Sequence, residues 1–88
     1  MKTGTQFTGT IPASGSKTWF THEWPVAWNV VWTVVPTTMA VGTAKQVEWD
    51  VAVQKTSAAH FTYWLTVRNL TTSEIGVEAR YAVLEGEA

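Results

Sequence analysis

The chain has 88 residues, which is enough for one domain and too few for a second hydrophobic core. Its six basic residues are scattered and balanced by seven acidic ones, for a formal charge of −1, so no nucleic-acid partner is expected. The absence of cysteine excludes disulfides and thiolate metal sites. Residues 1–88 are therefore expected to form a single domain.

The composition favours strands over helices. Fifteen Thr and twelve Val stand against three Leu, and side chains branched at Cβ suit a pleated strand better than a helix. No segment carries apolar residues at a helical period for long enough to predict a helix. Strands are instead predicted, in chain order, at residues 5–11, 17–22, 27–35, 45–55, 59–68 and 74–84.

Turn signals separate these segments, including Pro12 to Gly15 and Asn69 to Ser73. Short strands at this spacing predict an all-β fold, a single-domain antiparallel β-sandwich of about six to seven strands, either immunoglobulin-like or a small barrel. The stretch 63–81 loosely resembles the closing hairpin of immunoglobulin-like sandwiches in architecture, without a motif that indicates a family.

Alternation assigns faces to the strands. In 45–55 one face carries Val47, Trp49, Val51 and Val53, which predicts a half-buried strand. In 59–68 the inward positions are Phe61, Tyr63, Leu65 and Val67, and in 74–84 they are Ile75, Val77, Ala79, Tyr81 and Val83. Segment 27–35 is apolar on both faces, which predicts a strand that is central in its sheet or covered by another subunit.

Six tryptophans in so short a chain are more than one small core is expected to hide. Trp64 falls on the outward face of its strand between threonines, and an exposed indole among hydrogen-bonding groups suits the apolar face of a sugar ring. The candidate ligand-binding residues are Trp64, Trp24, His22, Glu78 and Arg80.

The segment 19–25 gathers three aromatic residues and a histidine ahead of Pro25. Its aromatic side chains fit either a binding lip at a strand end or a plug in the end of the sandwich. Glu23 is expected on the face opposite His22 if the strand continues unbroken. Trp28 and Trp32 share a face with valines, which favours the core or a subunit interface for both.

Other chemistry is weakly supported. No nucleophile elbow, phosphate loop or zinc motif is present, so we expect no enzyme and no cofactor. Glu48 and Asp50 share a strand face and could offer oxygen ligands to calcium, but without calcium-loop spacing a solvated strand face is the simpler interpretation. Asn69-Leu70-Thr71 fits a glycosylation acceptor, although an Asn that starts a turn explains it more simply.

The longest apolar stretch is too short to span a bilayer as a helix, and without a basic amphipathic helix a membrane-active role ranks below the other functions. Polar residues follow Met1, so we expect a cytoplasmic protein or one released without a cleavable signal peptide.

The sequence thus favours a small lectin-like, carbohydrate-binding module that forms a homo-oligomer and stacks sugar on an exposed Trp. The alternative is a structural or assembly module that forms a homo-oligomer through an aromatic sheet face and binds no small ligand.

Overall fold

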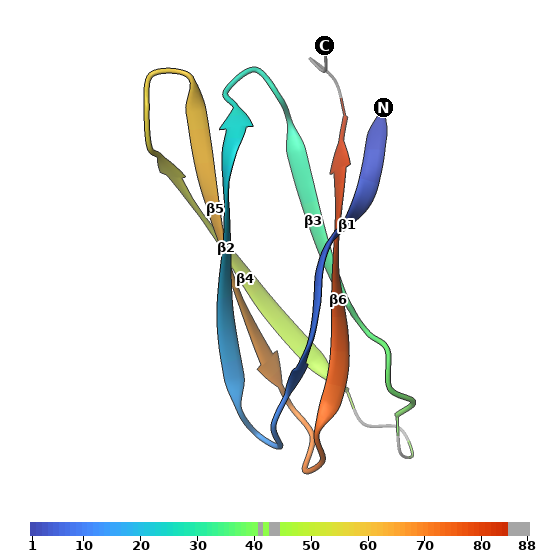
Figure 1. Ribbon diagram of the computed structural model, residues 1–88. Helices are drawn as coiled ribbons and strands as arrows, with labels where there is room; N and C mark the ends of the chain where they lie inside the picture. Colours follow the sequence, from blue (N-terminus) through green and yellow to red (C-terminus); the bar gives the residue numbers. More distant parts are fainter. Residues whose placement is uncertain (41, 43–44, 85–88) are drawn as a thin grey trace.

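A computed structural model describes residues 1–40, 42 and 45–84. These residues form six strands and no helix, which confirms the all-β prediction (Figure 1). The strands are β1 (Lys2–Ile11), β2 (Ser16–Pro25), β3 (Val30–Pro36), β4 (Val47–Lys55), β5 (His60–Asn69) and β6 (Ile75–Val83).

The strands form two three-stranded sheets packed as a sandwich. The first has the order β1-β6-β3 and the second β2-β5-β4, and every pairing is antiparallel. Figure 1 shows the β1–β2 and β5–β6 turns at one end of the sandwich, and the β2–β3 and β4–β5 connections at the end where β1 begins. Because β5 and β6 belong to different sheets, the hairpin suggested for residues 63–81 is wrong: the chain crosses between sheets there.

The core lies between the inner faces of the two sheets. Leu65 and Val67 of β5 and Val77, Ala79 and Val83 of β6 are almost completely buried, as alternation predicts for the central strand of each sheet. The central strands have hydrogen-bonded neighbours on both sides, so their inner faces receive the most cover.

Aromatic side chains fill the core at the end where β2 finishes. The Trp24 ring lies edge-on to Trp32, with ring centroids 5.6 Å apart, and to Tyr81, with centroids 5.1 Å apart. Tyr63 contacts both tryptophans, and Trp28, in the turn before β3, meets Trp24 at 6.2 Å. Edge-to-face contacts of this kind add stability beyond the area they bury.

The indole N–H groups of Trp24 and Trp32 differ in their hydrogen bonding. Trp24 Nε1 donates a hydrogen bond to Thr21 Oγ1 at 2.8 Å. Trp32 Nε1 is buried and has no hydrogen-bond partner among the described residues. A buried indole N–H without a partner costs free energy, so shape complementarity with its neighbours must hold Trp32 in place.

A buried asparagine fastens the other end of the sandwich. Asn69 Nδ2 donates to the carbonyl oxygens of Ile11, Pro12 and Ser73 at 2.7–3.1 Å. Its Oδ1 accepts from the backbone N–H and the hydroxyl of Thr71. With its side chain buried and engaged, Asn69 acts as the turn residue that the simpler interpretation of the sequence predicts.

A β-bulge in β2 changes which residues face the core. The register with β5 shifts between Thr21 and Trp24, and Glu23 adopts a φ of 66°. The extra residue turns Trp24 inward, and His22 and Glu23 both line a hollow on the outer face. The expectation that His22 and Glu23 lie on opposite faces is therefore wrong, because it required an unbroken strand.

Two strands are less covered than the alternation predicts. β3 is an edge strand, not a central one, and its outward Val31 is 47% exposed. In β4 the predicted inner residues Val51 and Val53 are 40% and 56% exposed. β4 lies at the edge of its sheet and diverges from the first sheet toward its carboxyl end (Figure 1), so this half of β4 is only partly covered.

Candidate functional site

The outer face of the second sheet carries an exposed aromatic patch, made of Phe20, His22 and Trp64. The register places Phe20 of β2 directly opposite Trp64 of β5, with Ala52 of β4 on the other side of Trp64. Outward positions of three neighbouring strands therefore meet at one level of the sheet, since side chains at paired positions share a face.

The rings of the patch form a continuous strip. The Phe20 and Trp64 centroids are 5.1 Å apart with planes 32° from parallel, and those of Phe20 and His22 are 6.0 Å apart at 28°. Phe20 is 59% exposed and Trp64 39% exposed. The three rings thus present apolar surface to solvent instead of packing into the core.

The neighbours of Trp64 on β4 orient its ring. Trp64 Nε1 donates a hydrogen bond to Gln54 Oε1 at 3.2 Å, which fixes the indole edge toward β4. Ala52, directly beside Trp64, is too small to cover the ring. The indole is consequently held in one orientation with its face open.

Polar side chains surround the patch. A shallow hollow of about 460 Å³ lies at this position, lined by Phe20, His22, Glu23, Gln54, Thr56, Ser57, His60, Thr62 and Trp64. Ser57 Oγ lies 3.3 Å from His60 Nδ1, and Thr62 Oγ1 donates to Thr56 Oγ1 at 3.4 Å. Hydroxyl, amide and imidazole groups therefore flank the rings with both donors and acceptors.

The charged groups on this face lie further along the strands. Arg68 of β5 pairs with Asp50 and with Glu48, the latter at 3.5 Å. The hydrogen bond that Arg68 donates to the Asp50 carboxylate, together with the charge of that carboxylate, raises the pKa of the Arg68 guanidinium above its usual value. Glu48 and Asp50 thus already share a cation, and no group of three or more metal-binding side chains occurs among residues 1–40, 42 and 45–84.

The structure brings together two of the five candidate ligand-binding residues. Trp64 and His22 line the same hollow. Trp24 is buried in the aromatic core, where it plugs the end of the sandwich. Glu78 and Arg80 pair with each other on β6, in the opposite sheet from Trp64.

The two candidate interface residues pack against the protein's own core. Trp32 is buried, and Trp28 is partly buried with the ammonium group of Lys2 5.2 Å from its ring centroid. Sequence reasoning missed Phe20 and Gln54 as neighbours of Trp64. Finding them requires knowing that β5 lies between β2 and β4, and alternation within single strands carries no such information.

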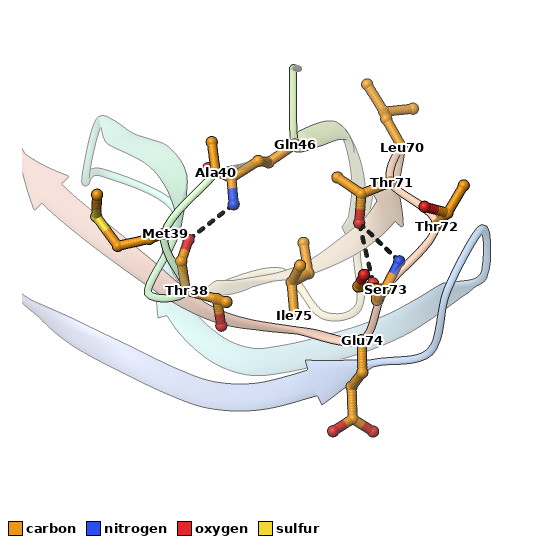
Figure 2. Close-up of a pocket in the computed structure, with 10 residues that line it drawn as sticks. All are labelled: Thr38, Met39, Ala40, Gln46, Leu70, Thr71, Thr72, Ser73, Glu74 and Ile75. Carbon is orange, nitrogen blue, oxygen red and sulfur yellow. Dashed lines mark hydrogen bonds between the residues drawn. The ribbon is translucent and has the colours of Figure 1, made fainter. Parts of the chain in front are cut away.

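A second hollow lies at the opposite end of the sandwich. A cavity of about 330 Å³ opens between residues 38–40, Gln46 and the β5–β6 turn (Figure 2). Its rim is held by a hydrogen bond from Gln46 Nε2 to the Thr38 carbonyl oxygen at 2.7 Å, while the Glu74 carboxylate points away from it. The lining lacks an aromatic ring, so the aromatic patch is the better candidate for a stacked ligand.

The described part of the chain holds no helix of the length and hydrophobicity that a bilayer crossing requires. Comparisons with protein-family models, curated proteins and solved structures found no match to this chain.

Proposed function

We propose that the protein binds carbohydrate on the outer face of the second sheet, with Trp64 as the stacking platform. The observation that carries this proposal is the exposed pair of Phe20 and Trp64, whose indole is fixed by Gln54. Exposed aromatic rings lose the favourable burial that a core position provides, so their place on an open sheet face calls for an occupant.

A sugar ring fits both the shape and the chemistry of this site. One face of a pyranose presents C–H groups that pack on an aromatic ring, while its hydroxyls need hydrogen-bond partners at the edges. Gln54 and His22 lie beside the rings and offer these partners. A neutral sugar suits the site better than an anion, because the basic Arg68 is already engaged by Asp50 and Glu48.

The site is shallow and solvent-exposed, which favours weak binding per site. A glycan array screened with the purified protein, with intrinsic tryptophan fluorescence recorded for each hit, tests the proposal. We expect a saturable hit that changes the fluorescence, because the indole of Trp64 would exchange water for a sugar face. A blank array from a folded sample would overturn the proposal.

Variants locate the site. Trp64→Ala should lower the affinity for the hit sugar at least tenfold, equivalent to about 1.4 kcal/mol, and Phe20→Ala should lower it less. Arg80→Ala is the matched control on the opposite sheet and should bind like the wild type. Circular dichroism checks that each variant is folded, and retained binding by folded Trp64→Ala would remove Trp64 from the site.

A further inference from the structure

The four edge strands of the sandwich differ in how their edges are protected. β1 is interrupted by a register shift between Thr5 and Phe7, and β2 by the bulge between Thr21 and Trp24. β3 is the shortest of the six described strands and ends at Pro36. Bulges, short length and proline are three of the devices that keep edge strands from pairing with another chain.

β4 carries none of these devices. Its nine residues from Val47 to Lys55 pair with β5 without a register shift and include neither Pro nor Gly. Among the six described strands only β5 pairs with β4, along one of its two sides, so a regular row of backbone N–H and C=O groups faces outward on the other side. Such an edge is a template for a further strand.

The same strand exposes apolar side chains. Val51 and Val53 point toward the inner side of their sheet but are 40% and 56% exposed, because the first sheet only partly covers this half of β4. Pairing with another strand would cover both the open backbone edge and these valines. The two observations are independent, and both point to the same partner geometry.

We propose that β4 pairs antiparallel with β4 of a second copy of this chain, around a two-fold axis at Val51. A two-fold axis makes the contact self-complementary and closed, as in most homodimers. It places Val51 opposite Val51 of the second copy, and Trp49 opposite Val53. The inner faces of the two copies then form one apolar surface.

The opposite face of β4 is compatible with this register. Glu48 falls opposite Gln54 of the second copy, and Asp50 falls opposite Ala52, so no like charges are directly opposed. Lys55 shares the inner face with Val53 and falls opposite Val47 of the second copy, at the end of the strand pair. Arg68 already neutralises Glu48 and Asp50 within each copy.

This dimer gives a continuous six-stranded sheet with both aromatic patches on the same face. Trp64 lies level with Ala52, one residue from the axis. With strands about 4.8 Å apart and a rise of about 3.4 Å per residue, the two Trp64 Cα atoms would lie roughly 16 Å apart. Where the proposed sugar binding holds, two weak sites at this distance act together on a multivalent glycan.

The first test measures mass in solution. Sedimentation equilibrium from about 10 μM to about 1 mM should show the 9.7 kDa chain converting to a dimer. A single strand pair is smaller than a standard interface, so we expect weak association.

Val53→Lys should raise the dimer Kd at least tenfold by placing a charge against Trp49. Val31→Lys, at a residue of similar exposure on β3, should leave the Kd unchanged.

The second test reads the register. Since the chain has no cysteine, Val51→Cys introduces a single thiol that would meet its copy at about 5 Å between Cα atoms, within disulfide range. In Val53→Cys the two thiols would lie about 14 Å apart along the pair, out of range. Under mild oxidation, Val51→Cys should form a covalent dimer at least tenfold faster than Val53→Cys.

Each outcome decides the proposal. A monomer throughout the concentration range, equal cross-linking of the two cysteine variants, or a dimer that Val53→Lys leaves intact would overturn it. Sugar binding is scored separately: monomeric Val53→Lys should keep its affinity for a soluble monovalent sugar and lose at least tenfold on a dense glycan array. If the wild type does not bind soluble sugar, the proposed function is refuted and the proposed dimer is unaffected.

Discussion

Trp24 and Trp64 carry the same side chain in opposite environments, and the difference comes from one inserted residue. The bulge at His22 and Glu23 turns Trp24 into the core, where its indole N–H bonds to Thr21. Trp64 lies on an uninterrupted strand and keeps the outward position that alternation gives it. Trp24 therefore packs in the core, whereas Trp64 contributes to the surface.

The first prediction at this scale concerns the stability contributed by each indole. Trp24→Ala should lower the free energy of unfolding by about 3–5 kcal/mol, because it removes a large buried side chain and leaves a cavity. Trp64→Ala should lower it by about 1 kcal/mol or less, through loss of the cross-strand contact with Phe20. Urea unfolding monitored by circular dichroism measures both, and equal losses would contradict the assignment.

Because of Tyr63, the free energy of unfolding is expected to decrease at alkaline pH. Burial raises the pKa of its phenol above the usual value of 10.0. Below that value both folded and unfolded states hold the proton, and the group contributes no pH dependence. Between the unfolded and the folded pKa only the unfolded state loses its proton, so stability falls as pH rises. Above the folded pKa the loss is complete.

The corresponding variant is Tyr63→Phe, which cannot ionise. Its free energy of unfolding should decline less steeply than that of the wild type as the pH rises above about 10. Urea titrations near pH 8 and near pH 11 compare the two slopes directly. Parallel declines in the two proteins would show that Tyr63 does not cause the alkaline loss.

Among the strands, the sequence predicts the central ones, β5 and β6, best. Alternation in 59–68 and 74–84 identified the buried faces of β5 and β6, because central strands express the two-residue period fully. It failed at the bulge in β2, where one extra residue shifts the period, and it overestimated the burial of β4. Edge strands contact one neighbour only, so their cover depends on contacts that the local pattern does not contain.

The end of the sandwich fastened by Asn69 offers a prediction for a whole element. Asn69→Ala would leave the Ile11, Pro12 and Ser73 carbonyl groups without this donor and release the turn that Thr71 completes. We expect a loss of about 2–4 kcal/mol in the free energy of unfolding, since buried polar groups without partners are costly. Thr72→Ala, exposed in the same turn, is the control and should change stability by less than about 0.5 kcal/mol.

For the whole molecule, strand order decides which predicted residues form a site. Trp64 and His22 come together because β2 pairs with β5, while Glu78 and Arg80 lie on the other sheet. The contact between Phe20 and Trp64 was not predicted for the same reason, since it depends on a pairing between strands far apart in sequence. Pairing between strands that are distant in sequence is determined by the packing of the complete sandwich, not by any one segment.

The β4 edge and the aromatic patch belong to the same sheet, on different surfaces of it. Assembly through the edge would leave the patch open, whereas assembly through the patch would compete with a sugar. The placement of the two surfaces therefore keeps the proposed sugar site apart from the proposed dimer contact. It also allows them to operate together in one dimer.

The most direct test of the proposed sugar site follows the indole N–H signals of the six tryptophans in a proton–nitrogen correlation spectrum during titration with the array hit. The proposed site predicts that the Trp64 signal shifts with saturation, because its N–H and ring border the bound sugar, while the signals of buried Trp24 and Trp32 stay in place. A saturable shift confined to another tryptophan, or no indole shift with binding established by the array, would contradict it.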